Sequence, residues 1–189
     1  MAGLHEAGAL LLAHGKTHIW QHSQAVATES LRLAGLFGVD SKACETAALC
    51  HDIGGILQPA DMLARAKTRG FVIDPAEEKY PFLLHQRFSG LFCREMLGIE
   101  NEAVLSAVEC HTTLKPFAGP VDMVVFLADK IAWDQTGEPP YLVEVQRALK
   151  HSLAAGCLAY MEYAMEHGMI LMPHGWLLAA RQWLRAVCK

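Results

Sequence analysis

Four histidines and one aspartate stand where the surrounding sequence predicts apolar side chains, and a second aspartate directly follows one of these histidines. They are His22, His51, Asp52, His85, His111 and Asp129. A titratable group that faces a protein core is destabilising by several kcal/mol unless it is paired or coordinates a metal. Imidazole and carboxylate ligands together suit iron, manganese or zinc. The six residues therefore predict a metal centre within a helical core.

The segment around Asp129 illustrates the pattern. An apolar stripe at helical spacing passes through Val121, Val125, Ala128 and Ala132. Asp129 falls inside this stripe, whereas Lys130 is expected to point elsewhere. An inward carboxylate requires cations nearby, so the stripe indicates that Asp129 faces other members of the set.

His51 and Asp52 are neighbours in the sequence, and neighbouring side chains on a helix diverge by about 100°. The glycines at 54 and 55 end the helix and let the backbone turn away, so that both side chains can face one ion. Considered alone, each of His22, His85 and His111 is better explained as a core histidine that bonds a backbone carbonyl. The metal interpretation therefore depends on the whole set.

Apolar residues recur at helical spacing along nearly the whole chain, with no sustained alternation of period two, which predicts an all-α fold. The expected helices cover about 4–14, 17–37, 41–52, 59–70, 82–97, 101–111, 121–134, 141–167 and 173–187, with a loop at 71–81. The absence of repeats and linkers predicts one domain over 1–189. Its metal-binding core covers about 15–135, and the helices of 141–188 pack on it.

Composition excludes several classes of function. The chain has 189 residues, with 16 Lys and Arg against 20 Asp and Glu. It therefore lacks the excess of basic residues that is typical of nucleic-acid-binding proteins. No apolar stretch approaches the roughly 18 residues that cross a bilayer. The N-terminal segment lacks the basic start of a signal peptide. We therefore expect a cytoplasmic protein with a small-molecule substrate.

The order of the six residues resembles that of the HD-domain metal-dependent phosphohydrolases. The surrounding segments are similar to those of the YqeK family of small bacterial HD proteins, and they read HSQAVATESLRLAGLFGVD, AALCHDIGG, LLHQRFSG, AVECHTT and VVFLADKI. The resemblance implies an HD-domain helical bundle with two metal ions, often iron, with manganese, magnesium or zinc as alternatives. It also implies symmetrical hydrolysis of diadenosine tetraphosphate to two ADP.

Carried over residue by residue, the resemblance implies that one metal is held by His22, His51, Asp52 and Asp129. His85 and His111 would hold the second metal, with Asp52 bridging the two. Two such ions bind phosphate oxygens and lower the pKa of a water between them. Asp52, beside His51, is then expected to orient the attacking hydroxide.

The chain departs from the family pattern where basic residues are expected to handle phosphate. Ile19, Gly55 and Gln135 stand at these positions. Because Arg and Lys normally neutralise phosphates, the substitutions predict a changed substrate. The candidates for replacement substrate contacts are Thr112, Arg87, Lys115 and Lys130.

Two other functions stay open. The chain can be a non-catalytic metal- and ligand-binding protein that has kept the centre, or an iron oxygenase on the same scaffold. A homodimer through the apolar C-terminal helix is a further possibility. Two histidines are marginal candidates, His18 as a second ligand one turn before His22 and His174 at a pocket mouth. The incidental histidines are expected to be His5, His14, His151 and His167.

Overall fold

A computed structural model describes residues 2–188, with side chains from residue 6 onward, so the side chain of His5 lies outside the described residues. All regular elements within this range are helices, which confirms the predicted all-α fold. The α-helices and the two 3-10 helices (η) are α1 (Ala2–Ala13), α2 (Thr17–Phe37), α3 (Ser41–Cys50), η1 (Ile53–Ile56), α4 (Pro59–Thr68), α5 (Pro75–Lys79), η2 (Pro81–Leu84), α6 (His85–Glu95), α7 (Glu102–Cys110), α8 (Pro120–Ile131), α9 (Leu142–Leu149), α10 (Leu153–Glu166) and α11 (Gly175–Val187).

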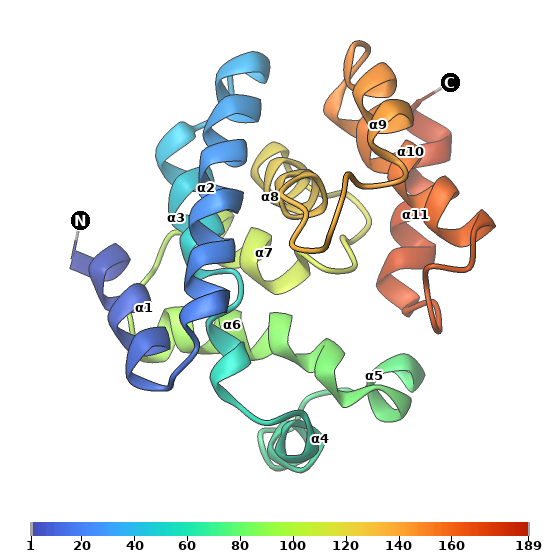
Figure 1. Cartoon of the computed structure of the whole chain (residues 1–189). Coiled ribbons are helices and arrows are strands. Elements are labelled where there is room, and N and C mark those ends of the chain that lie inside the picture. The colour runs from blue at the N-terminus through green and yellow to red at the C-terminus, as the bar shows by residue number, and fades with distance from the viewer. Residues whose placement is uncertain (1, 189) are drawn as a thin grey trace.

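The helices pack around α8, which is seen almost end-on near the middle of Figure 1. The long helix α2 packs against α3 and α8, and α7 contacts α3, α6 and α8. The C-terminal helices α9, α10 and α11 form a separate side of the molecule, and α10 joins them to α8. One continuous apolar core extends from Ala7 in α1 to Leu184 in α11. This shared core supports the expected single domain, which stays a prediction.

The region 141–167, expected as one helix, forms two. Helix α9 ends at Leu149, and the Ser152 hydroxyl then accepts the backbone N–H of Ala155 to begin α10. A serine at this position satisfies a free N–H at the start of a helix. The apolar periodicity continues on both sides of the break, which is why the sequence pattern did not reveal it.

The expected loop at 71–81 contains the short helix α5. Asp74 accepts the N–H of Ala76, while Glu77 accepts the N–H of Asp74, and together they form a capping box with Pro75 in the first turn. A helix of five residues is too short to show a periodic apolar face. Its position matters because α5 lies against the C-terminal part of the chain.

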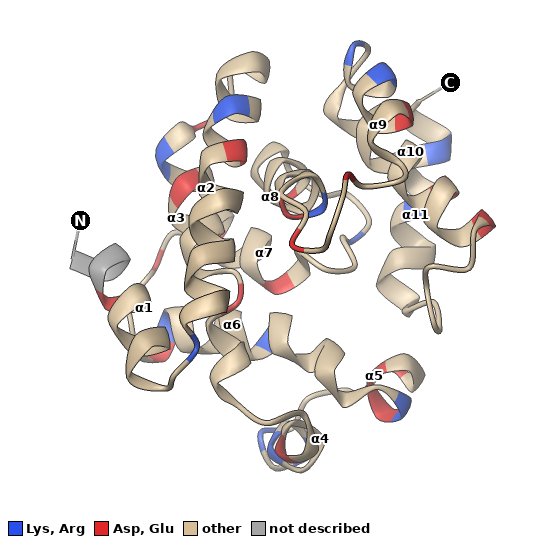
Figure 2. Ribbon diagram, in the orientation of Figure 1, with Lys and Arg blue, Asp and Glu red and all other residues tan. Residues whose placement is uncertain are grey.

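Lys, Arg, Asp and Glu residues are interspersed over the helices in Figure 2. Among the helices that the structure describes, none combines the length and the apolar character needed to cross a membrane.

Candidate metal centre

The six predicted residues come from five helices and meet at one place. His22 lies in α2, His51 directly follows α3, and Asp52 precedes η1. His85 begins α6, His111 directly follows α7, and Asp129 lies in the last turn of α8. The contacts among their side chains join residues up to 107 positions apart in the sequence. We call these six residues the HD cluster.

Gly54 allows the chain after Asp52 to pack closely on α6. Its N–H donates a hydrogen bond to the Ser89 hydroxyl over 2.8 Å. A Cβ at this position would lie 2.2 Å from the backbone oxygen of His85, far inside van der Waals contact. Glycine is therefore required for the close packing that brings Asp52 within 3.1 Å of the His85 ring.

One side of the HD cluster is built around Asp129. Its Oδ1 atom lies 2.9 Å from Nε2 of His22 and 3.5 Å from Nε2 of His51. The same His51 nitrogen lies 3.5 Å from Oδ2 of Asp52. Ligand atoms of His22, His51 and Asp129 all fall within 4.8 Å of one another, so this group can hold a metal ion.

The other side of the HD cluster is built around Asp52. Its Oδ1 atom lies 3.1 Å from Nε2 of His85 and 3.3 Å from Nε2 of His111. These two imidazole nitrogens are 3.0 Å apart. The two carboxylate oxygens of Asp52 therefore face different imidazoles, Oδ2 toward His51 and Oδ1 toward His85 and His111.

The chemistry of the donors fits a metal ion. The rings of His51, His85 and His111 each donate Nδ1–H to a backbone carbonyl three residues earlier, over 2.6 to 2.8 Å. In a neutral imidazole this leaves the lone pair on Nε2, which is the usual arrangement of a metal-binding histidine. Within the described residues, Nε2 of His51 and Oδ1 of Asp52 are buried without a hydrogen-bond partner. A cation among them would satisfy all of these acceptors.

The protonation states of the two aspartates and of His111 also suit a metal. Burial raises the pKa of Asp129, but Lys130 and the neighbouring imidazoles outweigh it and hold this pKa well below its ordinary value. Burial acts likewise on Asp52, where His51 and the other imidazoles hold the pKa well below the ordinary value. Burial lowers the pKa of His111 to about 4. At neutral pH the two carboxylates are charged and His111 is neutral, as metal ligation requires.

Burial lowers the pKa of His51, but Asp52 and Asp129 outweigh it and raise this pKa to about 9, and Asp52 outweighs burial in the same way to raise the pKa of His85. A metal ion would therefore compete with protons for these two rings.

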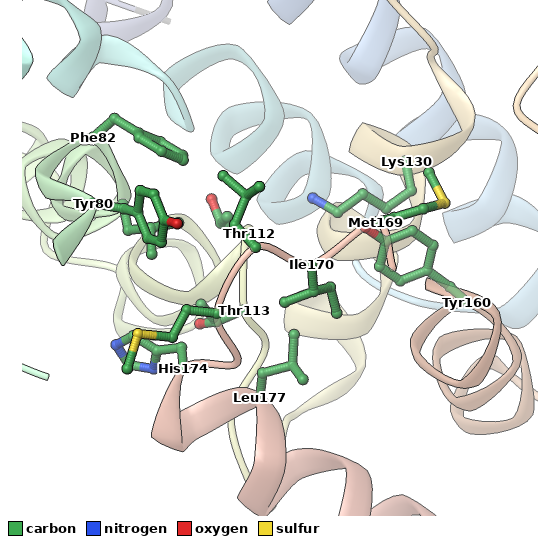
Figure 3. Close-up of a pocket in the computed structure, with 13 residues that line it drawn as sticks. Tyr80, Phe82, Thr112, Thr113, Lys130, Tyr160, Met169, Ile170, His174 and Leu177 are labelled. Carbon is green, nitrogen blue, oxygen red and sulfur yellow. The ribbon is translucent and has the colours of Figure 1, made fainter. Parts of the chain in front are cut away.

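A cavity of about 190 Å³ adjoins the HD cluster, between the η2 corner and the C-terminal helices. Two of its lining residues contact the cluster through their side chains. Thr112 Oγ1 lies 3.3 Å from Nε2 of His85, and Lys130 Nζ lies 2.5 Å from Oδ2 of Asp129. Figure 3 shows the Lys130 ammonium directed toward Thr112 across this cavity.

Lys130 does not point away as expected. Its side chain is only 12% exposed, and its ammonium lies 5.2 Å from the centre of the Phe126 ring and 5.9 Å from that of Tyr160. Although neighbours on a helix diverge, the long lysine side chain reaches back to Asp129. Attraction between the cation and the two aromatic faces supports this position.

The structure places the other two predicted substrate contacts away from the cavity. Arg87 donates to the backbone oxygen of Val72 over 2.8 Å and pairs with Glu77 over 3.1 Å. Lys115 donates to the Ser106 hydroxyl over 2.8 Å. Both basic residues lie outside the lining of the cavity.

Two of the three positions that lack a basic residue lie against each other. A Cβ on Gly55 would stand 2.7 Å from Cδ1 of Ile19, so the isoleucine fills the space that a side chain at 55 would need. Gln135 is exposed between α8 and α9. The structure therefore has an apolar contact where the family pattern places charges.

Several residues at the site were missed or left marginal in the sequence analysis. Gln86 is buried, accepts the N–H of Thr112 over 3.1 Å and donates to the Thr113 hydroxyl over 3.2 Å, so it fixes the turn after His111. The sequence feature that could have indicated this role is the polar amide of Gln86 directly after His85. His174 does line the cavity, whereas His18, His14, His151 and His167 are exposed.

Comparisons with known proteins agree with this geometry. The model of the family described as HD domain matches residues 19–134, more than half of the chain. A protein of Lactococcus lactis subsp. cremoris, described as an uncharacterized protein in the pepC 5' region, is 37% identical over 123 residues, which are 65% of this chain and 63% of that protein. A symmetrical bis(5'-nucleosyl)-tetraphosphatase of Halalkalibacterium halodurans is 34% identical over 125 residues, 65% of each chain. The matches thus span less than two thirds of these relatives.

A solved structure shares the fold. It is a predicted HD superfamily hydrolase involved in NAD metabolism from Clostridium acetobutylicum, with a TM-score of 0.85, 22% sequence identity and coverage of 96% of both chains. At this identity the likeness shows the fold, and it confirms the expected HD-type helical arrangement. The family match includes all six residues of the HD cluster, and this chain therefore belongs to the HD-domain family.

Proposed function

We propose that this chain is a dinuclear-metal-dependent phosphohydrolase that acts on a nucleotide or a dinucleoside polyphosphate. The observation that carries the proposal is the position of Asp52, whose two oxygens face two separate groups of imidazoles. A carboxylate in this position suits a bridge between two metal ions. The name of the Halalkalibacterium halodurans relative supports symmetrical hydrolysis of diadenosine tetraphosphate to two ADP as the first activity to test.

In this proposal the first ion would be held by His22, His51, Asp52 and Asp129. The second would be held by His85 and His111, with Asp52 shared between the two. Iron is the first expected metal because the resemblance to the YqeK family implies it. Manganese, magnesium and zinc are the alternatives, since imidazole and carboxylate ligands do not single out one metal. The carbonyl bonds of the three Nδ1–H groups fix the rings in the orientation that ligation needs.

Two divalent ions in such a site supply an activated water and the positive charge that phosphoryl transfer requires. The chain's own groups then position the reactants. Asp52, assisted by His51, orients the attacking water. Thr112 and Lys130 lie at the boundary between the HD cluster and the cavity, where a hydroxyl and an ammonium can donate to phosphate oxygens. No protein nucleophile is needed.

The proposal is tested by metal content together with activity. Purified protein is expected to contain about two ions per chain by elemental analysis. With added Fe(II), Mn(II) or Mg(II), it is expected to release phosphate or nucleoside diphosphate from a panel of phosphate esters and dinucleoside polyphosphates. Asp52→Ala is expected to lose both metal and activity. His14→Ala is the matched control, because His14 also bonds a carbonyl through Nδ1 but is exposed.

A folded Asp52→Ala protein that kept full metal content and full activity would overturn the proposal. The missing basic residues at Ile19, Gly55 and Gln135 favour the alternative of a metal- and ligand-binding protein without turnover. That alternative is the conclusion if two metal ions bind but the whole panel of esters is left intact. The cytoplasmic location and a homodimer stay predictions.

A further inference from the structure

The cavity beside the HD cluster is the place where the unreactive part of a substrate would lie. Thr112 and Lys130 line it, and each also contacts a member of the cluster, His85 and Asp129 respectively. A phosphate ester that reacts at the cluster therefore has its remaining atoms directed into this space. The chemistry of the walls then limits what those atoms can be.

The walls of the cavity are mostly aromatic and aliphatic. Tyr80 and Phe82 form one side, and Ile170 and Leu177 project from the C-terminal segment on another, with Tyr160 beside Lys130, as Figure 3 shows. Apolar walls with a few polar groups are typical of sites for small organic ligands. Aromatic side chains stack well on a flat ring.

The charge of the cavity argues against a long phosphate chain. Among its lining residues, which all lie in the described part of the chain, Lys130 is the one permanent cation. Its ammonium already lies 2.5 Å from Asp129, so much of its charge is neutralised. A tetraphosphate carries several negative charges that Arg or Lys would have to neutralise. These walls suit an uncharged ring better.

The C-terminal wall is held in place before any ligand binds. Asp74 accepts the N–H of Gly175 over 2.9 Å, and His174 accepts the N–H of Trp176 through Nδ1 over 3.0 Å. The opposite nitrogen of His174 lies 3.6 Å from the buried Glu77 carboxylate. These contacts attach the start of α11 to α5, so the cavity is preformed.

We propose that this cavity binds a flat, uncharged ring of the substrate, and that the chain acts on esters with one such ring and one or two phosphates in preference to a dinucleoside tetraphosphate. The inference rests on the proposed function for its reaction. The ring-binding step itself needs neither metal nor turnover. It can therefore be measured separately.

The test uses adenosine, which has a flat ring and no phosphate, and ribose, which lacks the ring. Isothermal titration calorimetry of the full chain is expected to detect adenosine and to show at least tenfold weaker binding of ribose. Phe82→Ala is expected to weaken adenosine binding at least fivefold, because it removes a stacking surface. Phe82 is 43% exposed, so its truncation is tolerable for folding. Ile170→Ala, in a segment outside any helix, provides a second variant.

Phe117→Ala is the matched control, because Phe117 is 81% exposed and lies outside the cavity lining, and adenosine binding is expected to be unchanged. Equal binding of adenosine and ribose, or no effect of both cavity variants, would overturn the inference. In the activity panel, kcat/KM is expected to be at least tenfold higher for AMP or ADP than for diadenosine tetraphosphate. The reverse order would also overturn it.

The two proposals fail in different ways. If adenosine binds as expected but every ester stays intact, the phosphohydrolase proposal fails and ring binding stands. If esters are hydrolysed in a manner that depends on Asp52 while adenosine does not bind, the cavity inference fails and the reaction stands.

Discussion

Nε2 of His85 lies 3.0 Å from Nε2 of His111, and both rings already donate Nδ1–H to backbone carbonyls. Burial keeps His111 neutral near pH 7 by lowering its pKa to about 4. The His111 lone pair therefore faces a second imidazole nitrogen at hydrogen-bond distance. A metal ion held by both rings would satisfy both nitrogens, whereas two neutral rings of this tautomer offer no donor to each other.

Metal removal is therefore expected to destabilise the fold. A ligand at about 100 times its dissociation constant stabilises a protein by about 2.7 kcal/mol, which for a chain of this size corresponds to about 5–10 °C in Tm. Thermal unfolding before and after chelation measures the shift. His85→Ala is expected to reduce that shift and the metal content, while His14→Ala leaves both unchanged. An equal Tm with and without chelator would contradict the expectation.

Lys130 is expected to contribute to activity without holding the metal. Replacing it in Lys130→Met removes a charge-assisted hydrogen bond to Asp129 and the one permanent cation of the cavity lining. A hydrogen bond from this ammonium to a phosphate oxygen of the reacting substrate would contribute about 1.5–3 kcal/mol, so its loss should lower kcat/KM about 10- to 100-fold. Lys115→Met, whose ammonium bonds Ser106 outside the cavity, should retain activity. Steady-state kinetics measure kcat/KM, and elemental analysis of the same samples shows whether the metal content has changed. A fall in kcat/KM that is matched by a loss of metal would contradict the expectation.

The sequence predicted the HD cluster better than it predicted the surroundings of the cluster. Five of the six residues interrupt apolar stripes, and such an interruption is visible within a single helix, while Asp52 directly follows His51 at a helix end. The structure brings all six together, although their role as ligands stays a prediction. The helical fold followed from the same periodicity, because most of these helices bury one face.

The cavity could not be predicted in the same way. Its C-terminal wall depends on the bond from Gly175 to Asp74, which joins residues 101 positions apart and interrupts no local pattern. The inward position of Lys130 is supported by Tyr160, from another helix, as well as by Asp129 and Phe126 of its own helix. The break at Ser152 was hidden because apolar periodicity continues across it. Contacts that depend on tertiary packing leave little trace in spacing.

Gly54 is expected to be sensitive to the smallest substitution. In Gly54→Ala the new Cβ would meet the backbone oxygen of His85 at 2.2 Å, and overpacking of this kind destabilises by about 1–3 kcal/mol. The variant should also lose metal, since η1 would move away from α6. Gly35→Ala in α2 meets no atom within 4 Å and should stabilise by up to about 1 kcal/mol. Urea unfolding measures the free energy of unfolding of both variants. Equal changes in Gly54→Ala and Gly35→Ala would contradict the packing argument.

The buried Glu77 carboxylate is expected to make the attachment of α11 to α5 dependent on pH. Burial raises the pKa of Glu77, but the nearby His174 ring, the N–H of Asp74 and the Arg87 cation outweigh it, and the pKa lies below the ordinary 4.5. Because the folded state holds the proton less tightly than the unfolded state, the charged carboxylate stabilises the fold above pH 4.5. That contribution is lost as the pH falls through the lower pKa of the folded state.

Glu77→Gln should therefore be less stable than the natural chain at pH 7, and the difference should shrink as the pH falls below 4.5. The amide oxygen can still accept the Asp74 N–H, so the capping bond is kept and the variant isolates the charge. Glu78→Gln is the matched control, because Glu78 is exposed and pairs only with Lys67 among the described residues. Urea unfolding at pH 7, 5 and 4 measures the differences. Other groups titrate equally in both proteins, so the difference in the free energy of unfolding reports the charge of Glu77. If this difference stayed constant down to pH 4 or below, the role of the charge would be contradicted.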